Sequence, residues 1–147
     1  MTGGLRYERI IDAPPEAVFD AFTSAGGQMA FYGKDDSGWV VDSESDVRVG
    51  GAWTIRFGPS PERLYRHHHV FEVIERPRRL VLDTTETRLD GTTLRFLTEF
   101  TFDQHERGTS MTMFQRGIPT AQLREEHGRG VPGAFDRLER HMRPAVR

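Results

Sequence analysis

Three consecutive histidines, His67, His68 and His69, are the residues of this sequence with the clearest capacity for chemistry. Side chains alternate between the two faces of a strand, so His67 and His69 would share one face with Phe71 and Val73, while His68 would point away. Two histidines at this spacing could hold a metal together with a carboxylate or a third nitrogen. No third ligand stands at a convincing spacing, so we expect no metal and no cofactor.

The remaining roles for His67 and His69 are as bases or as groups that orient a ligand, because unperturbed imidazole titrates near neutral pH. The alternative is that both are polar residues in a cavity wall, satisfied by hydrogen bonds or water. The sequence keeps both interpretations open.

A second polar group consists of Thr84, Thr98 and Gln115, which occupy inward positions of three predicted strands. A buried polar group without a partner costs about 1–3 kcal/mol, so these residues either bond to one another or form a polar patch for a ligand. Glu86 and His127 could join this patch. Their places at a strand end and on a helix surface favour exposed positions instead.

The stretch 94–115 predicts the strands that would position these groups. Apolar and polar residues alternate with period two, which is typical of a strand with one dry face and one wet face. The dry face carries Leu94, Phe96, Thr98, Phe100 and Phe102 in one strand, and Met111, Met113 and Gln115 in the next. The polar residues 105–108, ending in glycine, predict a hairpin between the two strands.

Similar patterns predict five further strands, over residues 5–12, 39–41, 49–57, 64–74 and 80–87. Prolines at 14 and 15 predict a helix that begins there and ends near residues 25–27, followed by a short second helix or a turn over 28–32. The acidic tract 42–46 predicts an exposed turn. The tail 119–142 is helical, but Gly130, Pro132 and Gly133 predict a kink or two successive helices.

Composition bounds the function. At 147 residues the chain is expected to form a single domain, 1–147, and a formal charge of −2 gives no reason to expect nucleic acid or an anionic membrane as partner. The absence of cysteine excludes disulfides, thiolate catalysis and zinc–thiolate sites. No apolar run reaches the length of a membrane span and no signal peptide is evident. We expect a cytoplasmic monomer or homodimer, the latter through Leu97 and Phe114 on the outer face.

The order of elements is strand, two helices, six strands and a long helix. Six consecutive strands joined by short turns are antiparallel neighbours, and one amphipathic helix can cover the apolar face of the curved sheet. The predicted class is therefore α+β.

Five short motifs resemble the START-like, or helix-grip, superfamily, also called SRPBCC. They are A-P-P-E-A-V-F at 13–19, D-V-R-V-G-G at 46–51, E-R-P-R-R-L-V at 75–81, G-T-S-M-T at 108–112 and F-D-R-L at 135–138. The branch is the one that groups polyketide cyclases with the activator of the ninety-kilodalton heat-shock-protein ATPase. The resemblance implies a seven-stranded curved antiparallel sheet wrapped around a long C-terminal helix, two short helices after the first strand, and a hydrophobic cavity between sheet and helix.

We therefore expect the protein to bind a small hydrophobic molecule, such as a lipid, polyketide or aromatic compound. The expected ligand-binding residues are Phe31, Tyr32, Trp53, Ile55, Phe71, Thr84, Phe96, Thr98, Phe100, Met111, Met113, Gln115 and Phe135. An alternative is a cyclase- or dehydratase-like enzyme in which His67 or His69 is the base and Gln115 or Tyr32 stabilises the enolate. A third possibility is a chaperone-associated interaction module. Whether the protein is an enzyme stays open.

Overall fold

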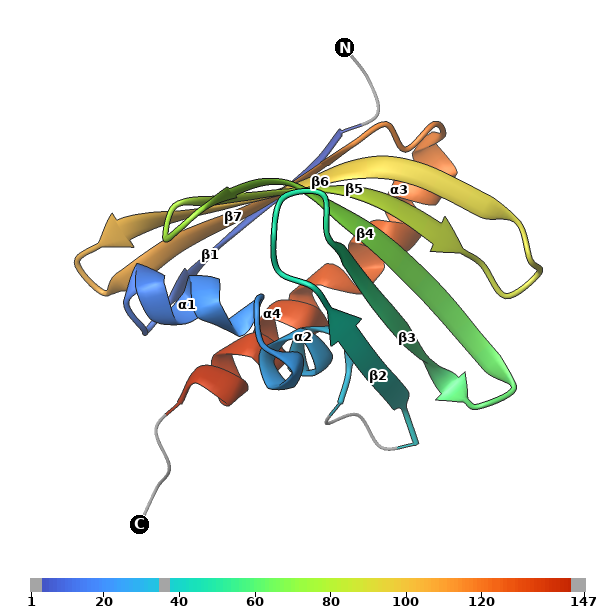
Figure 1. Cartoon of the computed structure of the whole chain (residues 1–147), viewed down its shortest axis with the longest axis horizontal. Helices are drawn as coiled ribbons and strands as arrows, with labels where there is room; N and C mark the ends of the chain where they lie inside the picture. The colour runs from blue at the N-terminus through green and yellow to red at the C-terminus, as the bar shows by residue number, and fades with distance from the viewer. Residues whose placement is uncertain (1–3, 35–37, 144–147) are drawn as a thin grey trace.

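The computed structural model describes residues 4–34 and 38–143, and its centre is a seven-stranded antiparallel sheet (Figure 1). The strands follow the order β1-β7-β6-β5-β4-β3-β2, so six of them are neighbours in sequence and β1 joins the β7 edge. Their bounds are β1 (Gly4–Ile11), β2 (Val40–Ser45), β3 (Ala52–Ser60), β4 (Arg63–Glu75), β5 (Arg79–Thr87), β6 (Thr93–His105) and β7 (Gly108–Arg116).

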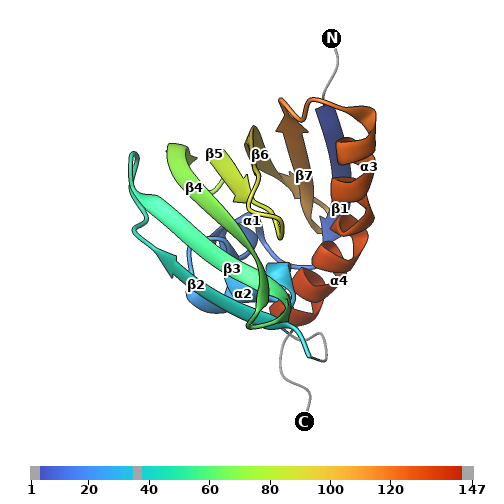
Figure 2. The same ribbon diagram turned by 90° about the vertical axis from the view of Figure 1, so that its right-hand side faces the viewer.

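The helices lie on the concave side of this sheet, as Figures 1 and 2 show. They are α1 (Pro15–Ala21), α2 (Ala25–Tyr32), α3 (Ala121–Arg129) and α4 (Val131–Met142). The predicted α+β helix-grip architecture is confirmed. The predicted interruption of the C-terminal helix is confirmed as well, because Gly130 ends α3 and begins α4, and Pro132 sits in the first turn of α4 where its missing N–H has no partner.

The core forms where the inner face of the sheet meets α1, α2 and α4. The inward residues of β6 are all buried, as their alternation predicted, and Phe100 stacks on Phe22 with ring centroids 4.5 Å apart. Phe135 and Leu138 of α4 join the same cluster. Arg9 of β1 then ties α4 to the sheet edge through Asp136 at 2.7 Å and a second carboxylate of the same helix.

The first helix is shorter than predicted. It ends at Ala21, and Ser24 accepts a hydrogen bond from the backbone N–H of Gly27 to begin α2. A Cβ on Gly27 would lie 2.1 Å from the backbone oxygen of Ala21. The glycine that was expected to end the first helix therefore serves close packing between two helices, and α2 begins at Ala25, not at residue 28.

Two expectations about the sheet are wrong. The acidic tract is mostly strand, since β2 runs through Asp42, which pairs with Arg56 of β3 on the exposed face. Charged side chains are common on an edge strand because they oppose pairing with another sheet. In β4 the register shifts between Phe71 and Val73, so Ile74, and not Val73, packs against the core. A bulge inserts one residue and reverses the faces beyond it.

Among the described residues, no helix is long and apolar enough to cross a membrane.

Candidate functional site

A pocket of about 510 Å³ lies between the inner face of the sheet, the end of α2 and the α3–α4 junction. Its volume is in the range of small-molecule sites. Apolar and aromatic side chains form one part of the wall, namely Phe31, Trp39, Phe57, Tyr65, Met113, Val131 and Ala134. Polar and charged residues form the rest, namely Tyr32, His67, Glu86, Arg88, Gln115, Glu126, His127, Arg129 and Arg137.

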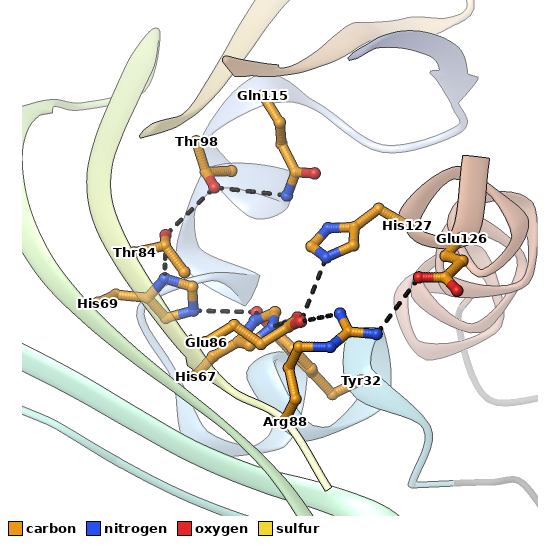
Figure 3. A network of polar contacts seen from close by, with 10 residues as sticks. All are labelled: Tyr32, His67, His69, Thr84, Glu86, Arg88, Thr98, Gln115, Glu126 and His127. Atoms are coloured by element: carbon orange, nitrogen blue, oxygen red, sulfur yellow. Dashed lines mark hydrogen bonds and ion pairs between the residues drawn. The ribbon is translucent and has the colours of Figure 1, made fainter. Parts of the chain in front are cut away.

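The two buried histidines meet at one hydroxyl group. The Tyr32 hydroxyl lies 2.7 Å from Nδ1 of His67 and 2.9 Å from Nε2 of His69 (Figure 3). His67 and His69 are 8% and 2% exposed. The last turn of α2 holds Tyr32 in place, because the Trp39 indole donates to its carbonyl at 3.0 Å and Arg137 donates to the carbonyl of Phe31 at 2.9 Å.

Beyond His69 the contacts continue across three strands (Figure 3). Nδ1 of His69 lies 2.8 Å from the Thr84 hydroxyl, which lies 3.2 Å from the Thr98 hydroxyl. The Gln115 amide donates to Thr98 at 3.5 Å. Antiparallel register explains the succession, since His69 stands opposite Thr84 and Thr98 stands opposite Gln115.

Beyond His67 the contacts end on a carboxylate. Nε2 of His67 lies 2.7 Å from Oε1 of Glu86, its partner across β4 and β5. The second oxygen, Oε2, accepts from Arg88 at 3.0 Å and lies 3.3 Å from Nε2 of His127 on α3. Arg88 also donates to Glu126 at 3.3 Å, so two polar contacts connect α3 to the end of β5.

Burial sets the protonation states along this series. Burial alone would raise the pKa of Glu86, but hydrogen bonds from His127 and His67 outweigh it and lower the pKa below its usual range. Burial lowers the pKa of His67 and lowers that of His69 well below the usual value. Burial, with the nearby Glu86 charge, raises the pKa of Tyr32. At neutral pH the site therefore holds a carboxylate, two neutral buried imidazoles and a neutral phenol.

These states determine the direction of every hydrogen bond in the series. A carboxylate only accepts, so His67 donates from Nε2 to Glu86 and its Nδ1 must accept from the Tyr32 hydroxyl. The Tyr32 oxygen then accepts from Nε2 of His69, whose Nδ1 accepts from Thr84. Thr84 in turn accepts from Thr98, and Thr98 accepts from the Gln115 amide. Each ring nitrogen of His67 and His69 is thereby engaged inside the protein.

The structure distributes the expected site residues between pocket and core. Five of them, Phe31, Tyr32, His67, Met113 and Gln115, line the pocket. The others lie within the packed interior: His69, Trp53, Ile55, Phe71, Thr84, Phe96, Thr98, Phe100, Met111 and Phe135. Of the two interpretations of Thr84, Thr98 and Gln115, mutual hydrogen bonding applies to all three, and Gln115 also faces the pocket.

The prediction that Glu86 and His127 occupy exposed positions is wrong. Glu86 is 5% exposed, and the His127 side chain is 10% exposed. Glu86 continues the inward alternation of Leu82 and Thr84, and this period of two could have predicted that Glu86 is buried. Arg88, which follows the end of β5, and Glu126 on α3 carried no comparable signal, because tertiary packing alone brings them together.

The polar cluster is not arranged as a metal site. Within residues 4–34 and 38–143, no group of three or more histidine, cysteine, aspartate or glutamate side chains could hold a metal ion. His67 and His127 both use Nε2 to contact the Glu86 carboxylate, which accounts for their proximity without an ion.

Comparisons with known proteins show which proteins this chain is related to. In solved structures the fold recurs in a Chromobacterium violaceum protein with 24% identity, a TM-score of 0.83, and coverage of 98% of this chain and 100% of that one. A Mycobacterium smegmatis protein has 15% identity, a TM-score of 0.81, and coverage of 99% and 94%. No curated protein matches the chain. A model of the family described as Activator of Hsp90 ATPase homolog 1-like protein matches residues 12–143. The chain therefore belongs to this family, within the START-like, helix-grip superfamily.

Proposed function

We propose that the protein binds a small, largely apolar molecule in the pocket between the sheet and the α3–α4 helices. The observation that carries this proposal is the pocket itself, about 510 Å³ in volume, whose wall combines an aromatic and aliphatic part with convergent polar groups. Phe31, Met113, Val131 and Ala134 would supply the apolar contact area, because each is buried and also lines the pocket.

The rigidity of the polar wall supports the same proposal. Tyr32, His67 and Glu86 are already hydrogen-bonded to neighbours in the protein, so little ordering of these side chains would oppose binding. A preorganised wall of this kind can orient a ligand without rearrangement. In an ordinary core, polar residues line no open volume. The open volume beside these polar groups therefore favours a ligand-binding site.

The alternative of an enzyme in which His67 or His69 is the base has less support. A general base needs a lone pair directed at the substrate, and both ring nitrogens of His67 and of His69 contact protein groups. The family description names an activator of a chaperone ATPase. Co-elution with a chaperone would be the test of that role for this chain.

Native mass spectrometry of the freshly purified protein, with extraction of any bound molecule, is the first test. A co-purifying apolar molecule near one equivalent is expected. A ligand added at a hundred times its Kd should raise the melting temperature by about 5–10 °C, from the roughly 2.7 kcal/mol that such binding contributes.

The matched variants are Ala134→Trp, which would place an indole in the pocket, and Arg140→Trp on an exposed position of the same helix. Ala134→Trp should lower ligand affinity at least tenfold, whereas Arg140→Trp should leave it unchanged. A milder change, Val131→Phe, covers the case in which Ala134→Trp does not fold. An apo mass together with no thermal shift across lipid, polyketide and aromatic panels would overturn the proposal.

A further inference from the structure

Two acceptor atoms at the pocket, on His127 and Gln115, have no partner within the part of the chain that the structure describes. Among residues 4–34 and 38–143, none forms a hydrogen bond with Nδ1 of His127 or with Oε1 of Gln115. Every fully buried side-chain nitrogen or oxygen of the described chain does have a partner. These two atoms are therefore accessible, and both residues line the pocket although they are about nine-tenths buried.

The hydrogen-bond series makes both atoms acceptors. The Thr98 hydroxyl donates its proton to Thr84, so it accepts a hydrogen bond from the amide nitrogen of Gln115. The carbonyl oxygen of Gln115 is therefore turned away from Thr98. Figure 3 shows this oxygen on the side of the amide away from Thr98. Glu86 only accepts, so His127 donates from Nε2, and in the tautomer that this bond selects the lone pair is on Nδ1.

The side chains of Tyr32 and His67 and the three arginines of the wall have partners within the chain. Both nitrogens of His67 and the Tyr32 hydroxyl belong to the series. Arg88 donates to two carboxylates, Arg129 donates to Glu125, and Arg137 donates to backbone carbonyls at the end of α2. The Tyr65 hydroxyl and the second N–H of Gln115 also have no partner among the described residues, but Gln115 Oε1 and His127 Nδ1 are the atoms that need a donor from the ligand.

From this geometry we infer that the ligand is a neutral molecule carrying a hydroxyl or N–H group, and that Gln115 Oε1 or His127 Nδ1 accepts the hydrogen bond from that group. This inference rests on the proposed function. At these two acceptors a ligand carboxylate would find no donor and would lie near the Glu86 charge, so a carboxylate is the disfavoured headgroup at this position.

Three naphthalene probes of one shape test the inference by calorimetry at pH 8, above the ordinary histidine pKa of about 6.5. They are 2-naphthol, which donates a hydrogen bond, 2-methoxynaphthalene, which only accepts, and 2-naphthoate, which is an anion. We expect 2-naphthol to bind at least about fivefold more tightly than 2-methoxynaphthalene, the value of one net hydrogen bond, and 2-naphthoate to bind most weakly.

Variants identify the acceptor. Either His127→Phe or Gln115→Met should bring the naphthol-to-methoxynaphthalene ratio close to one, while the exposed-residue controls His141→Phe and Gln122→Met should leave it unchanged. A ratio of one or less in the unsubstituted protein would overturn the inference even if both probes bind, and the proposed function would stand. If none of the three probes binds and no apolar molecule co-purifies, the proposed function fails, and this inference fails with it.

Discussion

The hydroxyl of Tyr32 offers the sharpest test of the buried network, through the substitution Tyr32→Phe. The change removes one oxygen and no other heavy atom. It leaves Nδ1 of His67 without its donor and Nε2 of His69 without its acceptor, and both rings are buried. A buried polar group that loses its partner costs about 1–3 kcal/mol. The substitution should therefore lower the free energy of unfolding by about 2–5 kcal/mol, a large part of the total for a domain of this size.

Urea denaturation followed by circular dichroism measures this cost. With a slope of about 1–3 kcal/mol per molar urea, the midpoint should fall by roughly 1–2 M. Tyr65→Phe is the matched control, because Tyr65 lines the same pocket and its hydroxyl forms no hydrogen bond with any residue in 4–34 or 38–143. This control should stay within about 0.5 kcal/mol of the unsubstituted protein. A Tyr32→Phe protein within the same margin would refute the bridging role of the hydroxyl.

Four further outcomes follow from the contacts described above. Burial lowers the pKa of His67 and His69 in the folded state, so their contribution to stability is present above pH 6.5 and decreases as the pH falls below it. The decrease should reach up to about 1.4 kcal/mol per pH unit for each histidine. A flat profile in urea titrations from pH 8 to pH 5 would contradict this prediction. The lowered pKa of Glu86 adds a further decrease below about pH 4.5, measurable when the urea titrations are extended to about pH 3. Nitrogen-15 spectra should show His67 and His69 both protonated at Nε2, and an Nδ1–H tautomer at either would reverse the proposed directions. Gly27→Ala should destabilise the fold by about 1–3 kcal/mol, because its Cβ would lie 2.1 Å from a backbone oxygen. Gly26→Ala should instead stabilise α2 by up to about 1 kcal/mol, because the nearest atom to its Cβ would be 3.5 Å away. Equal melting temperatures of the two variants would contradict this prediction.

The local sequence pattern was sufficient to predict the strands of the sheet and many of the residues on its inner face. Alternation over β6 identified the buried residues correctly, because a strand with one solvated side forces a period of two. The same rule failed beyond Phe71, where a bulge reversed the faces, and no residue type at that point signals an inserted residue. Gly27 was similarly misjudged, because close contact between two helices cannot be distinguished by sequence from a helix end.

The sequence by itself determined the seven strands, the interrupted C-terminal helix and the polar inward positions on β4 to β7, because these follow from the period of the side chains and from backbone chemistry. Only the tertiary structure decided what those positions do. Tyr32 reaches His67 and His69 from another element, and His127 reaches Glu86 from α3, across 35, 37 and 41 residues respectively. Such separations are set by the packing of helices on the sheet. That packing completed the hydrogen-bond series and left two acceptors facing the pocket.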